Sequence, residues 1–150
     1  ARLVSPLGRG AREDYRAMLA PLGLGLEARL DTRVELLSGG QRQAVSLAMA
    51  LAGDPKVLVL DEHCAALDPK AAEAVMRATL GAVERSGVTT LMVTHNMQHA
   101  IAHGARLVML HAGRLLFEVS GGEKAALTVE ALVQRFGIAD DELLLASRHG

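Results

Sequence analysis

Hydrophobic and polar positions along the middle of the chain change from helical spacing to a continuous apolar run. Apolar residues recur every three to four positions over 44–51, and their neighbours are apolar too, so this helix is expected to be buried on most sides. Gly53 is followed by Asp-Pro, which predicts its end. Residues 56–60 then form a short apolar run typical of a strand buried on both faces.

A strand–helix order repeats over the next part of the chain. Asp68 followed by proline predicts a helix N-cap with proline in the first helical position, and Gly87 predicts the end of that helix. A second β-rich run follows at 88–94, and residues 96–103 read as a short helix. Strand–helix–strand–helix order over 56–110 indicates a parallel α/β sheet.

Shorter elements are predicted on either side of this region, from breaks at Gly and Pro and from alternating apolar positions. A hydrophobic staple between Leu127 and Leu132 marks the entry to one of these helices. The predicted pieces are a helix at 11–20, a helical piece at 26–30, a hairpin of 106–110 and 114–119, and helices at 127–137 and 140–147.

Composition restricts the class of protein. The 150 residues are 50% hydrophobic and 22% charged, which fits at most one folded domain with a core. A formal net charge of -1 and an aromatic content of 2% argue against a nucleic-acid partner. The single cysteine, Cys64, excludes an intrachain disulfide and favours a reducing compartment. No apolar run approaches the roughly 20 residues that a membrane-spanning helix needs.

Residues with catalytic chemistry follow both predicted strands. Asp61 and Glu62 come after the first strand and His95 after the second, so neighbouring strands would direct all three into one crevice. An aspartate there can hold Mg²⁺, a glutamate can activate a water, and a histidine can donate to a terminal phosphate. An isolated Asp–Glu pair is more simply a solvated loop charge. Its position directly after a buried strand favours catalysis.

A second candidate site lies at the start of the helix that contains residues 44–51. Ser38, Gly39 and Gly40 precede its apolar positions. Backbone amides at a helix start bind anions, and glycines allow close backbone approach to a phosphate. Taken alone, the same segment is more simply an ordinary serine N-cap.

Together these segments resemble the nucleotide-binding subunit of ATP-binding cassette (ABC) transporters. Residues 37–41 (LSGGQ) look like the signature motif and 57–62 like the Walker B strand. Residues 65–68 look like the D-loop, and His95 looks like the switch histidine. The motifs match in order and spacing, and the resemblance covers about residues 11–120.

The resemblance implies an α/β fold, a partial P-loop NTPase of the ABC ATPase type. It implies a single incomplete domain over 1–150, with a helical subdomain and signature helix at 1–53, an α/β lobe at 54–120 and C-terminal helices at 121–150. The phosphate-cradling motif G-x-x-x-x-G-K-[ST] does not occur in the sequence. The chain therefore reads as the C-terminal part of such a subunit, and we expect it not to hydrolyse ATP alone.

A composite mechanism is also implied by the resemblance. Two ATPase subunits would hold two ATP molecules head to tail, with Mg²⁺, and would drive a transmembrane permease and its solute-binding protein from the cytoplasmic face of the membrane. The implied roles are Asp61 as metal ligand, Glu62 and His95 as catalytic residues, and Ser38, Gly39, Gly40, Gln41 and Asp68 as nucleotide-site residues, with Asp68 also linking the two sites.

Two alternatives stay open. DNA-repair and chromosome-organising ATPases of the ABC type also carry a signature motif and a Walker B strand, although residues 1–37 show no coiled-coil heptads. The chain could also be a non-enzymatic interaction module, against which the intact Asp61, Glu62 and His95 argue. His63 stands where many family members have proline, and packing is the favoured interpretation of this residue.

Overall fold

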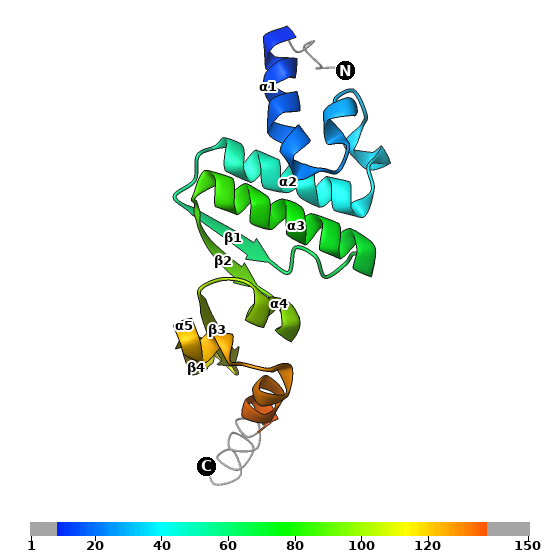
Figure 1. The fold of residues 1–150 in the computed structure, drawn as a ribbon. Helices are drawn as coiled ribbons and strands as arrows, with labels where there is room; N and C mark the ends of the chain where they lie inside the picture. Colours follow the sequence, from blue (N-terminus) through cyan, green and yellow to red (C-terminus); the bar gives the residue numbers. More distant parts are fainter. Residues whose placement is uncertain (1–8, 138–150) are drawn as a thin grey trace. The chain divides into compact units, whose positions relative to one another are not determined.

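The computed structural model describes residues 9–137 of the chain (Figure 1). Its contacts define two compact units, Ala1–Val93 and Thr94–Gly150, and each is described by itself. None of the described helices is both long and apolar enough to cross a membrane. The division into 1–53, 54–120 and 121–150 stays a prediction.

The described residues of the first unit form three α-helices and one pair of strands. The helix predicted at 11–20 is present and is followed by a 3₁₀ turn. Only residues 26–28 of the piece predicted at 26–30 are helical. The elements are α1 (Arg9–Leu19), 3₁₀ turns η1 (Ala20–Leu22), η2 (Leu26–Ala28) and η3 (Val34–Leu36), α2 (Gly39–Ala52), β1 (Val57–Asp61), α3 (Pro69–Ser86) and β2 (Thr89–Val93).

Strands β1 and β2 pair in parallel, as predicted. Their register runs from Val57 opposite Thr89 to Asp61 opposite Val93, and α3 connects them. Because the strands are parallel and in step, their carboxyl ends lie at the same edge of the sheet. This edge carries the residues that the sequence singles out.

The core of the first unit joins this strand pair to helices α2 and α3, which run side by side (Figure 1), and it also includes Leu19, Leu22 and Leu26 of α1, η1 and η2. Leu58 and Leu60 point into the core, whereas Val57 is 55% and Val59 60% exposed. The prediction that this strand is buried on both faces is wrong. Successive side chains of a strand point to opposite faces, and within the described residues α2 and α3 cover only one of them.

Helix α2 is also less buried than its composition predicts. Ala44, Leu47 and Ala48 are buried, but Met49 is 71% exposed. Burial on most sides is therefore wrong for this helix. Val45 and Leu51 are half-buried and pack against the core, whereas Met49 and Ala52 are exposed.

The second unit is built on a hairpin, which was predicted. Strands β3 (Arg106–His111) and β4 (Arg114–Ser120) pair antiparallel, with a register irregularity between Met109 and Leu110. The two turn residues, Ala112 and Gly113, both have positive φ (47° and 75°), as a tight two-residue hairpin turn requires.

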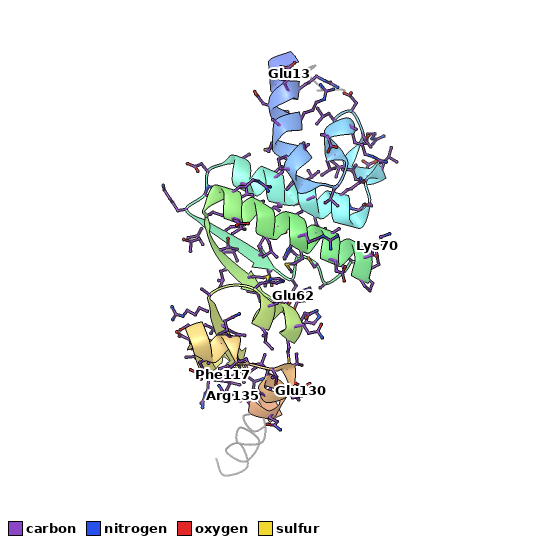
Figure 2. The ribbon with its side chains drawn as sticks, viewed as in Figure 1. Glu13, Glu62, Lys70, Phe117, Glu130 and Arg135 are labelled. Carbon is purple, nitrogen blue, oxygen red and sulfur yellow. The ribbon has the colours of Figure 1, made fainter. Side chains whose placement is uncertain are left out.

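Helices pack against this hairpin within the second unit. They are α4 (Met97–Ala102), α5 (Gly121–Ala125) and helical residues 129–137. Leu127 and Leu132, the two residues of the predicted staple, both belong to the hydrophobic cluster of this unit. The guanidinium of Arg135 lies 4.8 Å from the ring centre of Phe117 (Figure 2). The helix predicted at 140–147 lies outside the described residues.

A buried lysine links two helices of the second unit. Lys124 in α5 is 6% exposed, and its Nζ donates to the backbone carbonyl of Ile101 near the end of α4. An ammonium group at the last turn of a helix interacts favourably with its carbonyl groups. The bond therefore holds the end of α4 against α5.

Candidate functional site

The carboxyl end of the β1–β2 pair presents two acidic residues. Asp61 ends β1 opposite Val93, and Glu62 follows in the adjoining loop (Figure 2). Both residues are exposed. The Glu62 amide donates to the carbonyl oxygen of Val93 at 3.0 Å, so the strand ladder continues one residue beyond β1.

Glu62 has a backbone conformation that is unusual for its residue type. Its φ is 45°, in the left-handed region, which costs roughly 1–2 kcal/mol for a residue with a Cβ. Such residues persist where the surrounding structure fixes them, and they concentrate at functional sites. The chain turns sharply out of the sheet at this residue.

Three further backbone and capping bonds shape the loop from Glu62 to α3. The Ala65 amide donates to the Glu62 carbonyl at 2.9 Å, and the Leu67 amide donates to the Cys64 carbonyl at 3.2 Å. Asp68 accepts from the Ala71 amide at 3.0 Å, which confirms the predicted N-cap. The carboxylate of Asp68 therefore holds the start of α3, and its role at a nucleotide stays a prediction.

The residues directly after Glu62 are half-buried, as the packing interpretation of His63 requires. His63 Nε2 lies 3.3 Å from Oγ1 of Thr79 in α3. Burial raises the pKa of the Cys64 thiol, which favours the neutral thiol over the reactive thiolate. The sequence does not reveal the His63–Thr79 contact, because 16 residues separate its partners.

The start of α2 is a capping box. Ser38 Oγ accepts from the Gln41 amide at 3.2 Å, and Gln41 Oε1 accepts from the Ser38 amide at 3.1 Å. Gln41 Nε2 also donates to the Leu24 carbonyl at 3.0 Å. The simpler N-cap interpretation of Ser38 is thus confirmed, and both polar ends of the Gln41 side chain bind within the chain. A nucleotide role for either residue stays a prediction.

The two glycines of this motif have a packing role. A Cβ on Gly39 would lie 2.9 Å from Cδ2 of Leu67, and one on Gly40 would lie 3.3 Å from Cγ2 of Val75. The first contact joins the start of α2 to the loop after Glu62, and the second joins it to α3. Packing against α3 explains Gly40 without a ligand, whereas a Cβ on Gly39 would meet only the flexible end of the Leu67 side chain. The predicted approach to a phosphate remains an additional prediction.

Arg42 is a residue that the sequence did not single out. Its Nη1 donates to the backbone carbonyl of Leu37 at 2.6 Å. This hydrogen bond connects Arg42 in α2 to the residue that precedes the Ser38 cap. A charged residue on a helix surface carries no sequence signal for such a local contact.

A hollow of about 250 Å³ lies between α2 and β1. Its lining is mainly apolar, with Asp61 and His63 among the contributing residues. The lining residues are Gln43, Ser46, Leu47, Ala50, Leu58, Val59, Leu60, Asp61 and His63. The hollow is thus a space beside the strand end, lined by α2 residues beyond the capping box.

His95 belongs to the second unit, two residues after Val93. Local bonds order its surroundings. The Asn96 amide donates to Oγ1 of Thr94, and Oδ1 of Asn96 accepts from the His99 amide, both at 3.0 Å. The convergence of His95 with Asp61 and Glu62 in one crevice stays a prediction.

Comparisons with known proteins define the class to which this fold and this strand end belong. The family model described as ABC transporter matches residues 10–65. The chain is 48% identical over 131 residues to the tyrosine transport ATP-binding protein of Clostridioides difficile (strain R20291), covering 87% of this chain and 52% of that protein.

Solved structures agree with this class. The ADP conformation of MJ1267, an ATP-binding cassette of an ABC transporter, matches with a TM-score of 0.70 and 26% identity, over 90% of this chain and 53% of the other. The dimeric ATP-binding cassette MJ0796 bound to ADP and Pi matches with a TM-score of 0.61 and 30% identity, over 79% of this chain and 50% of the other.

The chain belongs to the ABC transporter ATPase family, which confirms the resemblance and the α/β fold class. It spans about half the length of the curated relatives it matches.

Proposed function

We propose that this chain is the catalytic and signature part of an ATP-hydrolysing subunit that powers a membrane transporter. The main support is the strand end, where exposed Asp61 ends β1 of a parallel strand pair and exposed Glu62 follows it, in a chain of this family. Relatives with transport ATP-binding names favour this function. No observation favours the DNA-linked ATPase or the non-enzymatic module.

Asp61 fits the role of a Mg²⁺ ligand. It offers an exposed carboxylate at the end of β1, and carboxylate oxygens together with water are the ligands that Mg²⁺ prefers. When bound, Mg²⁺ neutralises negative charge on the phosphates. The sequence has no G-x-x-x-x-G-K-[ST] motif, so no residue of this chain is assigned the phosphate grip of a P-loop.

Glu62 is the proposed general base. Its carboxylate belongs to an exposed residue at the strand end, where it can accept a proton from the water that attacks the terminal phosphate. His95 is proposed to donate to the same phosphate and to stabilise the charge that develops there. Glu62 and His95 would therefore act in the chemical step of hydrolysis rather than in the binding of ATP.

The start of α2 is proposed to complete the site of a second ATPase subunit. Ser38 is exposed, and the amides of the first turn carry partial positive charge that suits a phosphate. Gln41 and Asp68 would support this contact through the two caps they form. A dimeric cassette bound to ADP and Pi among the matched structures supports the two-subunit arrangement.

Partners of the whole protein follow from the same proposal. They are a transmembrane permease, a second ATPase subunit and a solute-binding protein, with the ATPase peripheral on the cytoplasmic face of the membrane. The relative whose name includes tyrosine transport points to an amino acid as the transported solute.

Hydrolysis by the full-length protein tests the proposal. We expect Mg²⁺-dependent phosphate release. We also expect Glu62→Gln to lower turnover by about 10²–10⁴-fold, the range for loss of a general base, while ATP binding persists and the ATP-bound dimer becomes long-lived. Phosphate release and size-exclusion chromatography measure the two effects. Normal turnover by Glu62→Gln would remove Glu62 from the role of base.

A further inference from the structure

The side chain of His63 ties the loop that follows β1 to the middle of helix α3. His63 Nε2 lies 3.3 Å from Oγ1 of Thr79, and Thr79 is only 2% exposed. Thr79 lies in the middle of an 18-residue helix that packs against α2. The loop is therefore attached to a fixed point in the core.

The helix determines the direction of this hydrogen bond. Thr79 Oγ1 donates to the backbone carbonyl of Val75 at 2.9 Å, one turn earlier in α3. A hydroxyl group has a single proton, so Oγ1 accepts from His63, and Nε2 of His63 carries the hydrogen. The contact thus requires a donor at the Nε2 position of residue 63.

The bond bears on Glu62 because His63 is the next residue. The left-handed backbone of Glu62 is held on one side by the Val93 carbonyl, which accepts from the Glu62 amide. On the other side, the His63–Thr79 bond fixes the residue that follows. Together with the Ala65 amide, which donates to the Glu62 carbonyl, these bonds define the direction in which the Glu62 side chain leaves the strand end.

We propose that His63 is a positioning residue for ATP hydrolysis, acting by donating from Nε2 to Thr79 and thereby fixing the backbone at Glu62. The inference rests on the proposed role of Glu62 as the base. A misplaced base slows the chemical step, whereas nucleotide binding depends on other groups. Loss of the bond therefore lowers kcat and leaves KM for ATP nearly unchanged.

Two substitutions of His63 in the full-length ATPase separate this role from simple packing. In His63→Gln the amide nitrogen takes the place of Nε2 and still donates to Thr79, whereas in His63→Asn it takes the place of Nδ1 and falls short. We expect His63→Asn to lower kcat about tenfold with KM within about twofold, and His63→Gln to keep more than about half of wild-type kcat.

Substitution of the acceptor gives an independent check. Thr79→Val removes the hydroxyl at nearly constant shape, so it should lower kcat as much as His63→Asn does. The double variant His63→Asn/Thr79→Val should be no slower than either single variant, because all three lack the same bond. Thr90→Val is the matched control. It removes a threonine hydroxyl that donates to the Val88 carbonyl in the β2 region, and its kcat should be unchanged.

Three results would overturn the inference: unchanged kcat in His63→Asn, equal losses in His63→Gln and His63→Asn, or additive losses in the double variant. Melting curves of every variant fix an assay temperature at which all are folded. Glu62→Gln, measured alongside, separates the two proposals. Normal turnover by Glu62→Gln contradicts the proposed role of Glu62 as the base, whereas a stalled Glu62→Gln with a fully active His63→Asn contradicts only the role of His63.

Discussion

The start of α2 and the loop after β1 both belong to motifs with expected nucleotide roles, but they are built differently. At the start of α2, Ser38 and Gln41 bind each other's backbone, and Gly40 is buried against α3. At the loop after β1, Asp61 and Glu62 are exposed, and a left-handed residue lies at the point where the chain leaves the sheet.

This difference separates side chains that cap a helix or pack in the core from side chains that lie exposed at the end of a strand. Each side chain of the capping box has a partner that stabilises the helix, and the glycines allow close packing. The exposed carboxyl groups at the strand end contribute no burial to the core. Substitutions at the start of α2 should therefore affect stability first, and substitutions at the strand end should affect hydrolysis first.

The largest stability effect is expected at Gly40. In Gly40→Val a Cβ lies 3.3 Å from Cγ2 of Val75, and the added methyl groups crowd α3 further. Overpacking of this kind lowers the free energy of unfolding by about 1–3 kcal/mol. Gly10→Val in α1 is the matched control, because a Cβ there has no neighbour within 4 Å. Equal urea-unfolding midpoints for the two variants would contradict the packing role.

A smaller effect is expected at the cap. Ser38→Ala removes the acceptor of the Gln41 amide, and loss of a serine N-cap lowers the free energy of unfolding by about 1 kcal/mol. Ser46→Ala is the control on the same helix, away from the cap. Thermal melts of both variants measure the difference. A Ser38→Ala variant as stable as Ser46→Ala would show that the capping box does not stabilise α2.

The smallest effect is a pH dependence in the second unit. Burial lowers the pKa of His103, and the positive charges of His99 and Lys124 lower it further. The unfolded chain therefore binds this proton more readily than the folded one. The stability that depends on a neutral His103 is present above the pKa of about 6.5 that this residue has in the unfolded chain. It should be lost as pH falls through the lower pKa of His103 in the folded state. His103→Asn should flatten this slope between pH 7.5 and 5, as measured by urea unfolding. An unchanged slope of stability against pH in His103→Asn would contradict this role of His103.

The sequence predicts local features of this fold better than contacts between distant segments. Asp-Pro at the start of α3, the hairpin of 106–110 and 114–119 and the Ser38 cap depend on neighbouring residues and are present as predicted. The one-sided burial of β1 depends on which elements cover the sheet, and no pattern within the strand contains that information.

The candidate site shows the same contrast between local features and contacts of distant segments. The position of Asp61 and Glu62 at the end of a strand followed from the chain order, because parallel strands end at one edge. The His63–Thr79 bond and the contact of Gly40 with Val75 join residues far apart in the sequence. Only the folded chain brings these partners together, so the sequence indicated the residue types without their contacts.

The central claim is that the strand end of one subunit and the helix start of another form one site. Single-turnover ATP hydrolysis by mixed full-length dimers tests it most directly. With Glu62→Gln in one subunit and Ser38→Arg in the other, one of the two sites stays intact, and we expect clear hydrolysis. With both substitutions in the same subunit and a wild-type partner, each site carries one defect, and hydrolysis should fall to background. Equal rates for these two dimers, which contain the same substitutions, would contradict the account.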